Sequence, residues 1–142
     1  MKTFTPSQIS GGERKWYIID AKGQNLGRLA TKISVLLKGK DRVDFVPYID
    51  NGANVIVINS DKFEVTGNKM EDKIYYRHTG YLGGLKETSL GELLRKKPTK
   101  PLELAVSGML PKNKLRSKMI SRLKLFTGEE HSYVAQKPEL IK

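Results

Sequence analysis

The side chains best suited to chemistry in this chain are basic, and they are concentrated in one stretch. From Val106 to Lys124 the sequence has six Lys or Arg residues and no Asp or Glu. These are Lys112, Lys114, Arg116, Lys118, Arg122 and Lys124. On a helix, Lys114, Lys118 and Arg122 would recur every four residues along one face, where like charges repel by a few tenths of a kcal/mol per pair. Such a stripe indicates a polyanionic ligand that offsets the repulsion; the alternative is a solvated surface face.

A second group of candidate binding residues mixes aromatic rings, bases and glycines between Tyr75 and Lys86. Rings stack on unpaired bases, while Arg and Lys neutralise phosphates. At least one of the adjacent tyrosines could instead belong to an ordinary strand face, since neighbouring strand residues point oppositely. The glycines could equally be turn residues. The candidate RNA-binding residues outside the Val106–Lys124 stretch are Arg28, Lys38, Lys40, Lys69, Tyr75, Tyr76, Arg77, His78, Tyr81 and Lys86.

Enzymatic chemistry has weaker support. The turn from Gly23 to Arg28 lies between a buried strand and a helix, where α/β enzymes cradle phosphates. Three residues separate its two glycines, and Arg28 stands where a phosphate loop has Lys followed by Ser or Thr. The cluster Glu129-Glu130-His131 could act as an acid and base, although adjacent acids in a polar tail are usually solvated. With two His and no Cys, a zinc site has little support. We expect no catalytic residue, no metal and no cofactor.

Length and charge restrict the class of protein. A chain of 142 residues predicts a single domain over 1–142, with an N-terminal arm at 1–15 and a C-terminal tail at 129–142. The 26 Lys and Arg against 15 Asp and Glu give a net charge of +11, which attracts nucleic acid or anionic membranes. No apolar run approaches the roughly 18 residues of a membrane span, and no signal peptide is visible. We therefore expect a cytoplasmic protein with RNA, not membrane, as its partner.

The elements that position these residues follow from apolar patterning. Two apolar runs, 16–19 and 55–58, predict buried strands, and helical spacing from Leu26 to Leu37 predicts a helix capped by Asn25 and ended at Gly39. Strand, helix and strand in this order imply parallel pairing. The fold class expected is α/β: a three-layer α/β/α arrangement with a small, mostly parallel sheet of about four strands, a short β-hairpin-like excursion and irregular terminal arms.

Later segments complete this prediction. The β-like runs 62–66 and 73–77 are expected to pair with each other, although a polar link of six residues is long for a tight hairpin. Ser89 and Glu92 form a capping box for one helix, and a second helix runs through Leu102 to Met109. Asn113 is expected to cap the basic helix, which a short strand at 123–126 follows.

Several separated motifs carry a family resemblance that covers nearly the whole chain from Trp16 onward. They are Leu26-Gly27-Arg28-Leu29-Ala30, Val65-Thr66-Gly67-Asn68-Lys69, Tyr75 to Gly80, Gly83-Gly84-Leu85-Lys86, Val106 to Pro111 and Leu123 to Gly128. Together they resemble the bacterial large-subunit ribosomal protein L-thirteen family. The chain departs from that pattern at Ser107, where the family usually has a basic residue, at Arg116, where it has a small one, and at Tyr81, where many members have His.

The resemblance implies a function. It implies a structural constituent of the large ribosomal subunit, located in the cytoplasm, that binds large-subunit ribosomal RNA and supports early assembly. The expected partners are that RNA and neighbouring large-subunit ribosomal proteins, with the chain a monomer within the ribosome. No enzyme activity, membrane or small-molecule substrate is expected. The alternative is a phosphate- or nucleotide-binding α/β enzyme that uses the turn from Gly23 to Arg28.

Overall fold

The structure is a computed structural model that describes residues 6–7 and 14–141. The predicted N-terminal arm at 1–15 therefore lies mostly outside the described residues. Its described part contacts the rest of the chain. Pro6 is buried, and the carbonyl of Ser7 accepts a hydrogen bond of 3.1 Å from the side-chain amide of Asn51.

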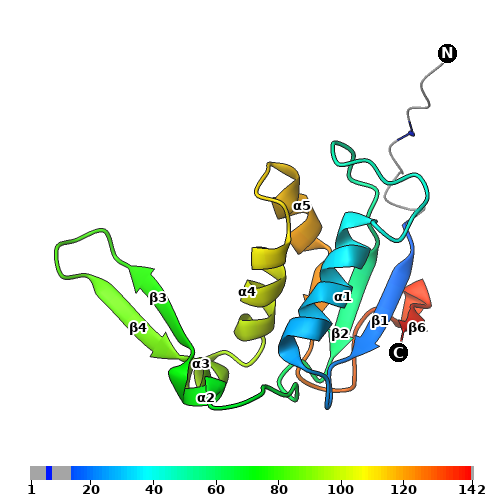
Figure 1. Ribbon diagram of the computed structural model, residues 1–142. Helices are drawn as coiled ribbons and strands as arrows, with labels where there is room; N and C mark the ends of the chain where they lie inside the picture. The colour runs from blue at the N-terminus through cyan, green and yellow to red at the C-terminus, as the bar shows by residue number, and fades with distance from the viewer. Residues whose placement is uncertain (1–5, 8–13, 142) are drawn as a thin grey trace.

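A four-stranded parallel sheet forms the centre of the molecule, in the order β5-β2-β1-β6 (Figure 1). Its strands are β1 (Trp16–Asp20), β2 (Asn54–Ile58), β5 (Leu123–Leu125) and β6 (Glu139–Ile141). The pairings of β1 with β2, β1 with β6 and β2 with β5 are all parallel. The central pair consists of the two unbroken apolar runs, because an inner strand of a parallel sheet is covered on both faces. The prediction of a mostly parallel sheet of about four strands is confirmed.

Helix α1 (Leu26–Lys38) connects β1 to β2 and has the predicted ends. The side chain of Asn25 accepts a hydrogen bond of 3.1 Å from the backbone N–H of Gly27. Gly39 ends the helix at a φ of 75°, a left-handed conformation that favours glycine. An added Cβ there would lie 3.0 Å from the carbonyl oxygen of Asn51, so the connector to β2 packs tightly against this turn.

One face of the sheet is covered by α1, α4 (Lys100–Met109) and α5 (Leu115–Ser121). The core between them contains Ile19, Ala21, Leu29, Ala30, Ile33, Leu37, Val55, Val57, Leu102, Val106, Leu110, Met119 and Leu123. The C-terminal segment covers the opposite face, where Tyr133 stacks on Trp16 with ring centres 5.2 Å apart. The three layers are thus helices, sheet and this C-terminal segment, which includes a 3₁₀ turn at Val134–Gln136.

The β-hairpin is formed by a different pair of strands from the pair predicted. Strand β3 (Ile74–His78) pairs antiparallel with β4 (Leu85–Ser89), whereas the run 62–66 makes only one bridge, between Glu64 and Asn25. The predicted pairing of 62–66 with 73–77 is wrong. The link between those runs contains the short helix α2 (Lys69–Asp72), which separates them.

Figure 1 shows the hairpin projecting away from the sheet and its helices, with α2 and α3 (Leu90–Lys96) at its base. Helix α3 begins at Ser89, whose hydroxyl accepts a hydrogen bond of 3.3 Å from the backbone N–H of Glu92. The carboxylate of Glu92 binds Lys96 at 2.5 Å instead of returning to the cap. Only half of the predicted capping box is therefore formed.

Strand β6 was not predicted, since the sequence pattern of 129–142 shows no period. It is three residues long and lies at the sheet edge, with Leu140 63% exposed. Its pairing with β1 brings together segments near the two ends of the chain. The local pattern of apolar residues does not predict such a distant contact.

Candidate nucleic-acid interface

The exposed part of the basic stretch lies on helix α5 and in the connection that precedes it. Lys112, Lys114 and Lys118 are exposed, while Met119 is buried against the core. The helix is shorter than predicted, and Asn113 lies one residue before the cap position, so the prediction that it caps the helix is wrong. The backbone N–H of Asn113 donates a hydrogen bond of 3.0 Å to the carbonyl of Pro111. Lys114 occupies the cap position without a side-chain hydrogen bond.

Arg122 departs from the predicted basic stripe. Helix α5 ends at Ser121, and Arg122 is 8% exposed beneath the connector between α1 and β2. Its guanidinium binds both oxygens of Asp50, with Nη1 to Oδ2 at 2.5 Å and Nη2 to Oδ1 at 2.7 Å. It also donates to the carbonyls of Leu37 and Ala53. The prediction that Arg122 lies on one exposed face with Lys114 and Lys118 is wrong, because its guanidinium is buried against Asp50.

Arg14 joins the same buried cluster. Its guanidinium donates to the carbonyl of Asp50 at 2.8 Å and to that of Gly52 at 2.7 Å. Burial, followed by the nearby positive charge of Arg122, lowers the pKa of the Arg14 guanidinium from its usual value. The cluster of Arg14, Asp50 and Arg122 therefore fastens the start of β1, the connector and the end of α5 to one another. Sequence reasoning missed Arg14 and Asp50, since no periodic pattern relates them.

Arg116 lies beside Ser107, and these are two of the three positions at which the sequence departs from the family pattern. The guanidinium of Arg116 donates a hydrogen bond of 2.6 Å to the hydroxyl of Ser107. Helices α4 and α5 thus meet at these residues. The positive charge of Arg116 therefore lies next to Ser107, where the family usually has a basic residue. These two departures from the family pattern are neighbours in space.

Lys38 and Lys40 come together with the basic stretch. They line a cavity of about 250 Å³ with Pro111 and Asn113, two residues of the α4–α5 connection. Two cations at and just beyond the C-terminal end of α1 thus share a cavity with Pro111 and Asn113, the residues that flank Lys112 in the sequence. Among the remaining candidates, Arg28 is exposed on α1, and Lys124 is half-buried on β5 opposite Ile56.

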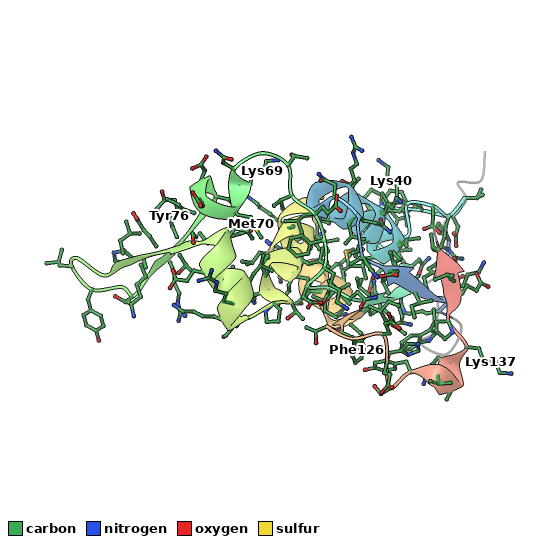
Figure 2. The ribbon with its side chains drawn as sticks, turned by 90° about the horizontal axis from the view of Figure 1, so that it is seen from below. Lys40, Lys69, Met70, Tyr76, Phe126 and Lys137 are labelled. Carbon is green, nitrogen blue, oxygen red and sulfur yellow. The ribbon has the colours of Figure 1, made fainter. Side chains whose placement is uncertain are left out.

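The hairpin carries the other group of candidate residues. Tyr76 is 64% exposed on β3, and Tyr81 is 80% exposed at the tip, next to the fully exposed Leu82. Gly80 and Gly83 have φ values of 91° and 71°, so they serve as turn residues. Figure 2 shows Tyr76 on the projecting hairpin, Lys69 near its base and Lys40 toward the opposite end of the molecule.

The strand register divides the hairpin side chains between two faces. Tyr75 and Arg77 share one face with their partners Thr88 and Lys86, and the other face carries Tyr76 and His78. Arg77 lies directly opposite Lys86. Like charges in that position destabilise a hairpin, so this face favours an anionic partner.

The turn from Gly23 to Arg28 offers no free phosphate cradle. The backbone N–H groups of Gly23, Gln24 and Leu26 bond to the carbonyls of Lys62, Ala21 and Glu64, respectively. That of Gly27 is taken by the side chain of Asn25. At the adjacent carboxyl end of β1, Asp20 adds a carboxylate that would repel a phosphate.

Neither a metal cluster nor a membrane-spanning helix is present in residues 6–7 and 14–141. Within these ranges, no group of three or more His, Cys, Asp or Glu residues is placed to hold a metal ion. None of the helices in this part of the chain is both long enough and apolar enough to span a bilayer.

Comparison with known proteins identifies the family. The sequence profile of the family described as Ribosomal protein L13 matches residues 14–132. The large ribosomal subunit protein uL13 of Brevibacillus brevis is 56% identical over 128 residues, covering 90% of this chain and 88% of that protein. The protein of the same name from Lachnospira eligens is 51% identical over 142 residues, covering 100% of this chain and 99% of that protein. The chain therefore belongs to the ribosomal protein L13 family of the large ribosomal subunit, a family of structural proteins and not of enzymes.

Proposed function

We propose that this chain is a structural constituent of the large ribosomal subunit that binds large-subunit ribosomal RNA and supports early assembly of the particle. The observation that carries the proposal is the exposed basic face made by Lys112, Lys114 and Lys118 beside Lys38 and Lys40. No carboxylate interrupts the sequence from Val106 to Lys124, so nothing within that stretch neutralises these charges.

The fold gives this face a rigid support. Helix α5 packs through Met119 on the core, with Leu115 and Ile120 partly buried beside it. The exposed lysines therefore extend from a fixed backbone. Each Lys that neutralises a phosphate releases a counterion from the RNA, and this release provides much of the binding free energy. Arg122 is excluded from the interface because Asp50 already binds its guanidinium.

The hairpin extends the proposed interface away from the core. Its exposed rings could stack on unpaired bases, while Arg77 and Lys86 meet phosphates. A two-stranded arm with little core of its own is only marginally stable in water, so packing against a partner would stabilise it further. In this role the chain is a cytoplasmic component of the ribosome, one copy per particle, beside neighbouring large-subunit proteins.

The salt dependence of binding tests this proposal. Neutralising Lys114 and Lys118 with Gln should reduce the slope of log affinity against log salt by about 0.7–0.9 for each phosphate that the protein no longer neutralises. Lys96→Gln is the matched control, since Lys96 is exposed on α3 but already paired with Glu92. If both sets of variants leave the slope unchanged, the face of α5 contacts water and the proposal fails.

A further inference from the structure

A cavity of about 520 Å³ lies at the foot of the hairpin, between α1, α2 and α4. Its volume is within the range of small-molecule binding sites. Helix α4 contributes an apolar wall that includes Leu104, Gly108 and Met109. Leu104 and Met109 are each 38% exposed, so apolar surface faces water there. Burying this wall under a ligand would be favourable.

The rim of the cavity carries positive charge and an aromatic ring. Lys69, Lys73 and Tyr75 line it, and none of the described residues that line it is acidic. The ammonium of Lys73 lies 5.6 Å from the ring centre of Tyr75. Burial raises the pKa of the Tyr75 phenol, so the ring remains neutral. The cavity is thus suited to an apolar planar group that carries a negative charge beside it.

One face of the hairpin continues this rim. Tyr75 and Arg77 point to the same side of β3, and Lys86 is the cross-strand partner of Arg77. Positive groups therefore continue from Lys73 to the paired cations further along the strands. The alignment suits a ligand with regularly spaced negative charges, and a single small anion would occupy only one end of it.

We propose that the cavity receives one unpaired base of the RNA, with the flanking phosphates bound by Lys69 and Lys73 and a more distant phosphate bound between Arg77 and Lys86. The inference rests on the proposed function and names the form of RNA involved. An unpaired nucleotide supplies a planar base that packs against the α4 wall and the ring of Tyr75. It also supplies a phosphate that Lys69 and Lys73 can bind. The rest of the RNA chain supplies the charges that the hairpin requires, which a free nucleotide does not.

Gly108 allows the cavity to be filled without disturbing the fold. It is exposed near the end of α4, and an added Cβ would meet no atom within 4 Å. Gly108→Trp should therefore occupy the cavity, and Gly108→Ala is the matched control that changes the same position but leaves the space open. Thermal melting of both variants checks that they fold like the unsubstituted chain.

The experiment combines affinity with base-specific chemical probing of large-subunit ribosomal RNA. The unsubstituted chain and Gly108→Ala should protect the same unpaired base. Gly108→Trp should restore the reactivity of that base and weaken binding by about fivefold to 150-fold, the usual effect of losing one stacked base. Protection of the RNA backbone by α5 should persist in all three proteins.

Three outcomes would overturn the inference. Equal affinity and equal base reactivity for the Trp and Ala variants would show that the cavity is empty in the complex, while the retained backbone protection would leave the proposed function standing. Absence of any protection by the unsubstituted chain would instead remove the proposed function together with this inference. A rise in melting temperature with submillimolar AMP, abolished by Gly108→Trp, would assign the cavity to a free nucleotide.

Discussion

Arg122 belongs to the basic stretch, but its role is structural. Its guanidinium makes two hydrogen bonds to Asp50, and both side chains are at least nine-tenths buried. A buried pair of this kind contributes modestly while it is complete, but removing one partner leaves an uncompensated charge. The cluster therefore holds the connector between α1 and β2 in place, and with it the cavity that Lys38 and Lys40 line.

This role predicts a large loss of stability from one substitution. Arg122→Met should lower the free energy of unfolding by about 3–5 kcal/mol, because Asp50 remains buried without its main partner. Urea denaturation measures the change. The exposed Lys118→Gln should cost less than about 0.5 kcal/mol. The double variant Arg122→Met/Asp50→Leu should regain part of the loss, and failure to regain any of it would contradict the pairing.

The lowered pKa of the Asp20 carboxyl should make the free energy of unfolding depend on pH. A hydrogen bond from the backbone N–H of Lys22, followed by one from the side-chain amide of Asn59, lowers the pKa of the Asp20 carboxyl. The unfolded pKa is near 3.9. With a lower folded pKa, the contribution is present above about pH 4 and is lost as the pH falls through the folded value.

The substitution Asp20→Asn removes that titration. The free energy of unfolding of the unsubstituted chain should fall more steeply than that of Asp20→Asn as the pH decreases below about 4, and the two curves should be parallel near neutral pH. Denaturant titrations over this pH range measure the difference. Parallel curves throughout would mean that the Asp20 carboxyl titrates alike in the folded and unfolded chains.

The two predicted ends of α1 are confirmed, whereas the predicted cap of α5 by Asn113 is wrong. Asn25 caps the start of α1 and Gly39 caps its end, as predicted. Each cap depends on hydrogen bonds and backbone conformation within a few residues. Arg122 was misplaced because its partner Asp50 is distant in sequence and the helix ends before it. The RNA contacts assigned to the other basic residues remain predictions.

At the scale of elements, the hairpin of β3 and β4 differs from the central sheet. Both of its strands are mostly exposed, whereas β2 has Val55, Ile56 and Val57 fully buried. Stability within a fold follows burial, so segments with few buried contacts open more easily. The hairpin should therefore be the least protected paired element of the RNA-free chain.

Hydrogen exchange tests that expectation. Amides of β3 and β4 should exchange at least about tenfold faster than those of β2 in the free chain, and should slow when large-subunit ribosomal RNA is added. The buried strand β2 serves as the internal control, since RNA should leave its exchange nearly unchanged. Equal protection of the hairpin and the sheet in the absence of RNA would contradict the expectation that the hairpin is the least protected paired element.

The elements also show what patterning can and cannot reveal. β1, α1 and β2 follow from apolar periodicity over consecutive residues, and their order implies the parallel pairing that the structure has. β4 and β6 were missed because neither has an apolar pattern: β4 is Leu-Lys-Glu-Thr-Ser, and β6 is three residues long. Their pairing partners are set by the Gly80–Gly83 turn and by the return of the chain to β1, respectively.

Over the whole molecule, the apolar core and the basic face occupy different places. The helices bury their apolar residues against one face of the sheet, and the basic face and the hairpin extend outward from that scaffold. The net charge of +11 opposes compaction of the free chain and favours association with a polyanion. Composition alone predicted this partner class, whereas the position of each charge required the folded structure.

Specific binding of RNA through the basic face is tested by a backbone protection map of large-subunit ribosomal RNA, recorded with this chain and an excess of small-subunit ribosomal RNA as competitor. A defined set of nucleotides should remain protected in the presence of the competitor and should lose that protection when Lys112, Lys114 and Lys118 are all replaced by Gln. Protection that the competitor removes completely, or that the triple variant retains in full, would contradict specific binding through the basic face.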